Sequence, residues 1–162
     1  MKTTYAIISM LIFSILSSCA PKEEAFVADD PVVIPSYDSI SAEKYGADDY
    51  GMKKYVMAFL KRGPNRDMDA DSAQALQMAH MDNIGRMAEE GKLVLAGPFF
   101  GDQDLRGIYI FNVSSIEEAE ALTNTDPAIQ AGVLEMDLME WYGSAAVMAI
   151  NDIHHKIAKI KH

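Results

Sequence analysis

The sequence predicts an α+β fold of the ferredoxin-like type, with the element order strand, helix, strand, strand, helix, strand (βαββαβ) and a C-terminal helical extension. Three observations lead to this fold class. A long amphipathic stretch follows a short apolar segment, two further apolar segments flank a polar turn, and an alternating segment follows a second capped helix. The 162 residues are enough for one compact domain with additional segments at its ends.

The first strand is expected over residues 53–60, which are short, apolar and aromatic and are followed by Gly63-Pro64. The first helix is expected to begin after an N-cap at Asp69 or Asp71 and to run to about Glu90, before Gly91. Its apolar stripe has a spacing that keeps six residues on one face: Ala73, Leu76, His80, Ile84, Met87 and Ala88. His80 is therefore predicted to face the core.

The second and third strands are expected over residues 92–96 and 107–113, the former closed by Gly97-Pro98. The polar turn at 101–104 lies between them. Two adjacent strands joined in this way favour an antiparallel pair.

Ser114 and Ser115 stand three residues before Glu117 and Glu118, which is typical of two overlapping capping boxes and predicts a second helix to about Leu122. A fourth strand with one buried face follows from the apolar alternation of Leu134, Met136 and Leu138. A helical stripe then continues after a possible N-cap at Ser144, with these members: Val147, Ile150, Ile153, Ile157 and Ile160.

The N-terminal segment 1–18 has the features of a secretory signal peptide. Lys2 precedes an apolar run over residues 5–16, which is shorter than the roughly 18 residues needed to span a bilayer. Leu16-Ser17-Ser18-Cys19 resembles the bacterial lipoprotein lipobox, and that resemblance implies cleavage before Cys19 and acylation of its thiol. An ordinary signal peptide with an incidental cysteine is the alternative.

Residues 19–51 are expected to be the lipidated cysteine and an acidic, proline-containing tether to a domain at 52–142, which is followed by the extension at 143–162. From the lipoprotein pattern, Ala20 in place of aspartate implies an outer-membrane lipoprotein of the bacterial cell envelope that faces the periplasm. The run Lys22-Glu23-Glu24 resembles the surface-export signal of some lipoproteins, although a hydrated tether would look the same.

The formal charge of −10 argues against nucleic acid as a partner, because so acidic a surface repels phosphate backbones. Cys19 is the only cysteine, so the mature body has neither an internal disulfide nor a free thiol nucleophile. No spacing of residues predicts a metal site, a phosphate-binding loop or a dinucleotide fingerprint, and no cofactor is expected.

His80 and Asp126 are the candidate catalytic residues, because one imidazole and one carboxylate in ordered surroundings are the minimal parts of a proton-transfer site. Each also has a structural explanation. A histidine on an apolar helical face is often a hydrogen-bonded core residue, and Asp126 before Pro127 is an ordinary N-cap. Both roles can coexist, since one carboxylate oxygen can cap while the other contacts His80.

Two further residues are candidates for substrate binding, each with an alternative. Arg106 could receive an anionic group or balance Asp102 and Asp104 at the surface. Trp141 could line a pocket or pack at a dimer interface.

Several linked motifs resemble the YCII-related (YciI-like) domain family over about residues 53–142: His80 with Ile84, the run 90–99 (EGKLVLAGPF), Arg106-Gly107, and the run 126–132 (DPAIQAG). The resemblance implies a dimeric α/β-barrel fold, in which two ferredoxin-like units pack sheet to sheet as a homodimer. It also implies His80 and Asp126 as the site pair of a small-molecule enzyme, with lyase- or isomerase-like chemistry on an aromatic or enolisable substrate. One member type is a dehydrochlorinase acting on a hydroxylated chloroaromatic ring. A non-catalytic, lipid-anchored binding or envelope-interaction module is the alternative.

Overall fold

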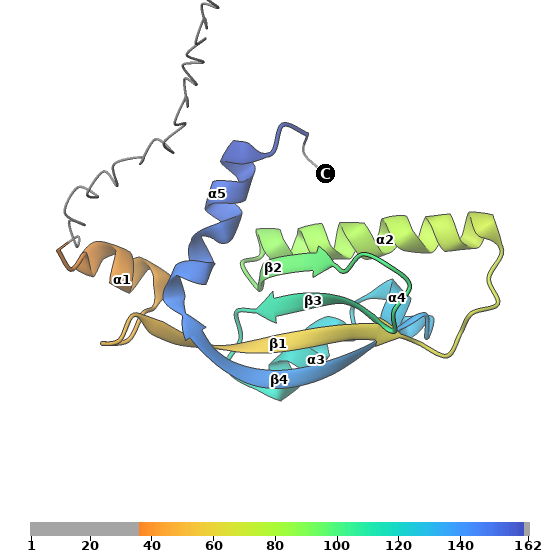
Figure 1. The fold of residues 1–162 in the computed structure, drawn as a ribbon, viewed down its shortest axis with the longest axis horizontal. Helices are drawn as coiled ribbons and strands as arrows, with labels where there is room; N and C mark the ends of the chain where they lie inside the picture. Colours follow the sequence, from red (N-terminus) through yellow and green to blue (C-terminus); the bar gives the residue numbers. More distant parts are fainter. Residues whose placement is uncertain (1–35, 161–162) are drawn as a thin grey trace, which may run out of the picture. The chain divides into compact units, whose positions relative to one another are not determined.

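The computed structural model describes residues 36–160, and every helix and strand given below belongs to the unit beginning at Tyr37 (Figure 1). The predicted signal peptide, Cys19 and the first part of the predicted tether lie outside the described residues. The elements are α1 (Ser39–Tyr45), β1 (Met52–Arg62), α2 (Ala70–Glu89), β2 (Leu93–Pro98), β3 (Leu105–Phe111), α3 (Ile116–Thr123), α4 (Pro127–Gln130), β4 (Leu134–Ser144), a 3₁₀ turn η1 (Ala145–Ala149) and α5 (Ile150–Ile157).

The four strands form one antiparallel sheet in the order β2-β3-β1-β4. This order, with α2 and α3 as the two crossover helices, is that of a ferredoxin-like βαββαβ unit, and it confirms the predicted fold class. β1 lies in the centre of the sheet and pairs with β4 along its entire length, from Met52 opposite Ser144 to Arg62 opposite Leu134.

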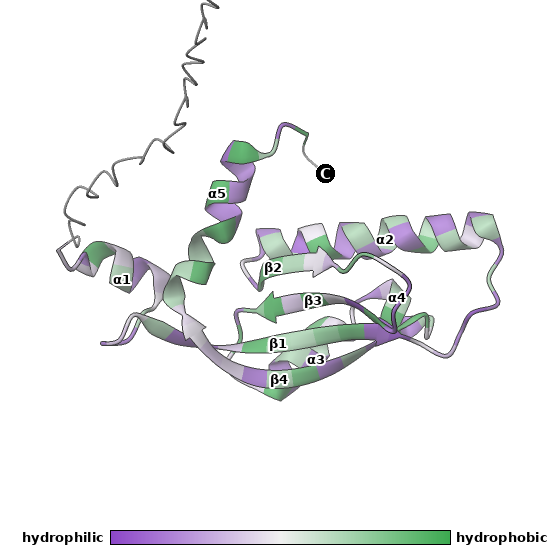
Figure 2. Cartoon of the chain, in the orientation of Figure 1, coloured by the Kyte–Doolittle hydropathy of each residue, from purple (hydrophilic) through white to green (hydrophobic). Residues whose placement is uncertain are grey.

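One face of the sheet is covered by α2 and α3 and carries the main core. Alternate residues of β1, namely Val56, Ala58 and Leu60, are buried there against Met87 of α2 and Ala119 of α3. Figure 2 shows the hydrophobic centre of β1 within this arrangement. The predicted stripe of α2 does face the core, although Ala73 at its N-terminal end is exposed.

Within residues 36–160, the outer face of the sheet is covered at one end only. Tyr55, Val94 and Ile110 are buried there against Val147 and Met148, which belong to η1. The side-chain amide of Asn151 also donates to the carbonyl oxygen of Leu93 at 2.9 Å, and so ties the start of α5 to β2. The C-terminal extension is thus part of the packed structure.

The strands and the C-terminal helix differ from expectation at their ends. β2 continues through Gly97 and Pro98, because it is an edge strand in which proline need not donate a ladder hydrogen bond. β4 extends well past Leu138 because β1 pairs with it throughout. Ser144 caps the 3₁₀ turn η1, and the helix α5 ends at Ile157, before the last isoleucine of the predicted stripe. Hydrophilic and hydrophobic residues alternate along α5 (Figure 2).

The helix α1 lies within the segment 19–51, which was expected to be a tether. α1 is capped by Asp38, whose carboxylate accepts from the backbone amides of Ile40 and Ser41, and it ends at Gly46 with φ of +68°. Lys44 of α1 forms an ion pair with Asp152 of α5 at 3.0 Å. The helix was missed because it is one short segment without buried residues, so no apolar period marks it. Within residues 36–160, no helix has both the length and the apolar composition to cross a bilayer.

Candidate functional site

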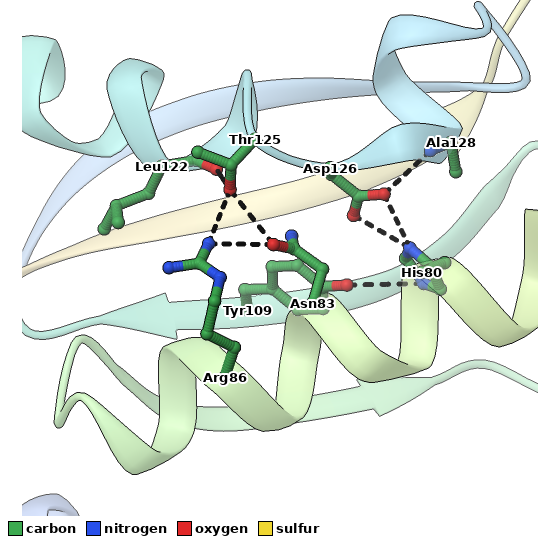
Figure 3. Close-up of polar contacts among 8 residues, drawn as sticks. All are labelled: His80, Asn83, Arg86, Tyr109, Leu122, Thr125, Asp126 and Ala128. Carbon is green, nitrogen blue, oxygen red and sulfur yellow. Dashed lines mark hydrogen bonds and ion pairs between the residues drawn. The ribbon is translucent and has the colours of Figure 1, made fainter.

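His80 and Asp126 are brought together from two different elements. His80 lies on the sheet-facing side of α2, and Asp126 is the N-cap of α4, with Pro127 at the first helical position. The Nδ1 atom of His80 lies 2.8 Å from Oδ2 and 3.0 Å from Oδ1 of Asp126 (Figure 3). Oδ1 also accepts the backbone N–H of Ala128 at 2.9 Å. One carboxylate therefore caps α4 and contacts the imidazole at the same time.

The two side chains of this pair are shielded from solvent. Asp126 is fully buried and His80 is 8% exposed. An ionised carboxylate can only accept, so Nδ1 of His80 is the donor to it, and in the neutral imidazole Nε2 then keeps its lone pair. Nε2 points toward the hydroxyl of Tyr109 on β3, at 3.4 Å (Figure 3).

Tyr109 completes a row of three polar groups, Asp126, His80 and Tyr109. Burial, and secondarily the charge of Asp126, raise the pKa of the Tyr109 hydroxyl far above its ordinary value. The phenol therefore remains protonated and able to donate a hydrogen bond to Nε2 or to a bound molecule. Tyr109 was not among the predicted site residues, although Gly107, Tyr109 and Phe111 alternate along the third predicted strand and so share one face.

His80 and Tyr109 line a cavity of about 380 Å³ between α2 and the β2-β3 end of the sheet. Most of its wall is apolar, with Leu60, Ile84 and Pro98 among the lining residues. An apolar cavity with a few convergent polar groups is the usual form of a small-molecule site.

A second set of hydrogen bonds holds α2 against the turn that carries Asp126 (Figure 3). Arg86 donates to Oδ1 of Asn83 at 2.8 Å and to Oγ1 of Thr125 at 2.9 Å. The Thr125 hydroxyl lies 2.7 Å from the carbonyl oxygen of Leu122 and 3.1 Å from Oδ1 of Asn83. These contacts fix the residue immediately before Asp126. Asn83 was absent from the predicted stripe, yet it follows His80 by three positions and lies on the same face.

The structure separates the two predicted substrate-binding residues. Arg106 lines the His80 cavity, and its guanidinium donates to the carbonyl oxygens of Gly101 at 3.1 Å and Gln103 at 3.4 Å. Trp141 does not line this cavity. It lies on the outer face of the sheet and packs on Tyr55, with ring centroids 5.5 Å apart. The physical reason is alternation, since Trp141 is three residues beyond Leu138, which faces the helices.

Metal ligands do not gather in the part of the chain that the structure describes, where no three His, Cys, Asp or Glu side chains are placed to share an ion. The polar groups at the cavity include an imidazole, which can accept or give up a proton, and a phenol, a guanidinium and the amide of Gln77, which can donate hydrogen bonds to an organic molecule.

Comparison with known proteins identifies the family. The YCII-related domain matches residues 55–142, which is just over half of the chain and includes both His80 and Asp126. The chain belongs to this family. The uncharacterized protein YjpA of Bacillus subtilis (strain 168) is 31% identical over 62 residues, which are 38% of this chain and 71% of YjpA.

A solved structure also resembles the YCII-related chain. It is 5-chloro-2-hydroxyhydroquinone dehydrochlorinase (TftG) from Burkholderia phenoliruptrix AC1100, in complex with 2,5-dihydroxybenzoquinone. The TM-score is 0.41 at 18% sequence identity, and the match covers 53% of this chain and 92% of that one.

Proposed function

We propose that this protein is a small-molecule enzyme in which His80 transfers protons, Asp126 orients the imidazole, and Tyr109 donates a hydrogen bond to the reacting molecule. The contact of 2.8 Å between Nδ1 of His80 and the buried carboxylate of Asp126, at the wall of a cavity, carries the proposal. Membership of the YCII-related domain family is consistent with it.

In this mechanism Nε2 of His80 accepts a proton from a carbon or hydroxyl of the substrate. The electron pair of the broken C–H or O–H bond forms a new C=C or C=O double bond, either in an enolate or with departure of a leaving group that keeps the electrons of its own bond. Asp126 stabilises the imidazolium that forms, because its carboxylate accepts the Nδ1 proton throughout. A substrate with an aromatic or enolisable centre suits the apolar wall of the cavity.

Solvent hydrogen exchange tests this proposal without a known substrate. The full-length protein is incubated in D₂O with a panel of enolisable ketones and hydroxylated aromatic compounds, and loss of carbon-bound hydrogen is followed by proton NMR. At least one compound is expected to exchange on the order of 100-fold faster with the wild type than with His80→Gln. His154→Gln, which replaces an exposed histidine of α5, is the matched control and should behave as the wild type.

A non-catalytic binding module is the second candidate, because the same cavity could hold a molecule without changing it. Equal exchange rates for the wild type and His80→Gln across the whole panel, with binding retained, would favour this module and contradict the enzyme.

The homodimer is a proposal that rests on the outer face of the sheet. Beyond the part covered by η1, this face presents apolar side chains that include Phe59, Ile108 and Met139, the last 57% exposed. A sheet with an apolar face needs a second layer to bury it, and a second copy packed sheet to sheet supplies one.

Met139→Glu is expected to convert the dimer to a monomer in sedimentation equilibrium. Met78→Glu on α2, at 56% exposure, is the matched control that should leave the dimer intact, and a monomeric wild type at micromolar concentration would contradict the proposal.

The place of the protein in the cell envelope is also a proposal. The sequence Leu16-Ser17-Ser18-Cys19 supports a lipid anchor on Cys19, in an outer-membrane lipoprotein that faces the periplasm or the cell surface. Cys19→Ala should release the protein into the soluble envelope fraction, since it removes the acylated thiol. Retention of this variant in the membrane would refute the lipoprotein assignment. Protease treatment of intact cells distinguishes the two faces of the membrane.

A further inference from the structure

Three of the four arginines in the chain line one cavity, although the protein carries a formal charge of −10. Arg62, Arg66 and Arg106 surround a space of about 300 Å³ beside the N-terminal half of α2. The fourth, Arg86, is engaged with Glu90, Asn83 and Thr125 elsewhere. Arginines concentrated in this way on an acidic protein create a local positive potential, which is the ordinary requirement for binding an anion.

This cavity adjoins the one that contains His80. Both are lined by Gln77, Arg106 and Leu134, so Arg106 faces the two spaces at once. Along α2, Ala73 lies in the wall of the arginine cavity and His80 in that of the other, about 10 Å apart by the rise of a helix. A single small molecule can therefore contact an arginine and the imidazole together.

The backbone of β3 directs Arg106 to this position. Leu60 of β1 pairs with Gly107, whereas the next residue, Lys61, pairs with Leu105, so Arg106 is an extra residue without a partner on β1. Such an irregularity turns a side chain away from the face that strict alternation would give it. Arg106 would otherwise follow Ile108 and Ile110 to the outer face, but it lines the same cavity as Tyr109.

A carboxylate of the protein already lies among these arginines. Asp102, in the loop between β2 and β3, forms an ion pair with Arg62, and its side chain is 93% exposed. The hydrogen bond and charge of Arg62, followed by the charges of Arg106 and Arg66, lower the pKa of Asp102. An exposed loop carboxylate that is held by these charges is a weak competitor for a bound anion, because solvent screens the pair.

We infer that the substrate carries a carboxylate or phosphate group, which Arg106 and Arg66, with Arg62, bind while His80 acts on the adjoining part of the molecule. This inference rests on the proposed acid–base function for the reacting end and adds the chemical class of the other end. The guanidinium groups supply paired donors that match the geometry of an oxyanion, and the apolar cavity takes the ring or carbon skeleton.

Binding measurements with three related compounds test the inference on the full-length protein. Hydroquinone has no anionic group, 2,5-dihydroxybenzoate adds a carboxylate to the same ring, and 4-hydroxyphenyl phosphate adds a phosphate. Calorimetry should give a dissociation constant at least about tenfold lower for one anionic compound than for hydroquinone. This gain in affinity should become smaller as salt is added, because salt screens the charges. The tighter anionic compound shows which oxyanion the arginines prefer.

Variants of the arginines and of their neighbours then show which residues produce this gain in affinity. Arg66→Gln should abolish this gain in affinity while the affinity for hydroquinone is unchanged, which also shows that the variant is folded, because Arg66 lines only the arginine cavity. Arg106→Gln should abolish the gain as well. Asp102→Asn should strengthen anion binding, because it frees Arg62. Lys61→Gln is the matched charge control, since Lys61 pairs with Asp137 on the outer face and should leave the gain intact.

The outcomes separate this inference from the acid–base proposal. Equal dissociation constants for charged and uncharged compounds, no binding of either anionic compound, or a gain that persists in both arginine variants would overturn the anion-binding inference. If the gain is present and lost in the arginine variants, but His80→Gln leaves hydrogen exchange unchanged, the anion subsite stands and the acid–base role of His80 falls.

Discussion

Replacing Asp126 with alanine removes two contacts of a fully buried carboxylate at once. The backbone amide of Ala128 loses its acceptor at 2.9 Å, and Nδ1 of His80 loses its acceptor at 2.8 Å. The N-cap bond is worth about 1 kcal/mol, and a buried hydrogen bond to a charged group about 1.5–3 kcal/mol. Asp126→Ala should therefore lower the free energy of unfolding by about 2.5–4 kcal/mol, a large share of the stability of a typical domain.

Asp126→Asn is the informative control, because it preserves the shape of the side chain. The amide oxygen, placed where Oδ1 now lies, remains 2.9 Å from the Ala128 nitrogen and keeps the cap. The amide nitrogen then stands in the place of Oδ2, 2.8 Å from Nδ1, where two donors would oppose each other. The imidazole should respond by moving its proton to Nε2, so that Nδ1 accepts. We expect stability within about 1 kcal/mol of the wild type, since both buried hydrogen bonds are retained.

Urea unfolding gives the two stabilities, and the ¹⁵N chemical shifts of the His80 ring give the tautomer. The assigned role of Asp126 would be wrong if alanine cost no more stability than asparagine, or if the ring of the asparagine variant kept its proton on Nδ1. Hydrogen exchange of the substrate panel should also be lost in Asp126→Asn, because Nε2 then carries the proton.

Two further predictions concern the backbone and the buried phenol. Gly63→Ala should destabilise the protein by about 1–3 kcal/mol or more, because its Cβ would stand 2.2 Å from the carbonyl oxygen of Gly132. Gly85→Ala, on the exposed side of α2 with nothing within 4 Å of the new Cβ, should instead stabilise it by about 0.5–1 kcal/mol in the same urea assay; equal effects would refute the packing described for Gly63. Because burial and Asp126 raise the pKa of Tyr109, the unfolded chain ionises this group near pH 10 while the folded chain does not, so the free energy of unfolding should fall as pH rises above about 10. Tyr109→Phe should show a shallower fall between pH 9 and 11, and an unchanged slope would contradict the assigned burial of the hydroxyl.

The elements of the βαββαβ unit could be predicted because their signals are local in the chain. Asp69 accepts from the amide of Ser72 as the N-cap of α2, and Ser115 accepts from that of Glu118 as the N-cap of α3. Helical spacing was also sufficient to predict that His80 faces the core. The fold class is therefore confirmed, whereas the catalytic roles of His80 and Asp126 stay predictions that hydrogen exchange can test.

The rest of the site depends on contacts between segments that are distant in sequence. Arg62, Arg66 and Arg106 form one cluster only because β1, the following loop and β3 meet beside α2. The irregular pairing at Arg106 is a property of two strands together, and neither strand shows it alone. Trp141 is a different case, since alternation from Leu138 already places it on the outer face, and the same period could have excluded it from the site.

The continuous helix α2 also limits where the chain can change in length. Each residue turns a helix by about 100°, so one inserted residue between Gln77 and His80 would rotate the imidazole away from Asp126 while Gln77 kept its place in the wall of the arginine cavity. The loop from Phe99 to Asp104 connects two strands on the surface and carries no part of the imidazole site. Among relatives that keep the imidazole site, the first half of α2 should accordingly keep one fixed length, whereas a change of length in this loop would alter the carbonyl groups that hold Arg106.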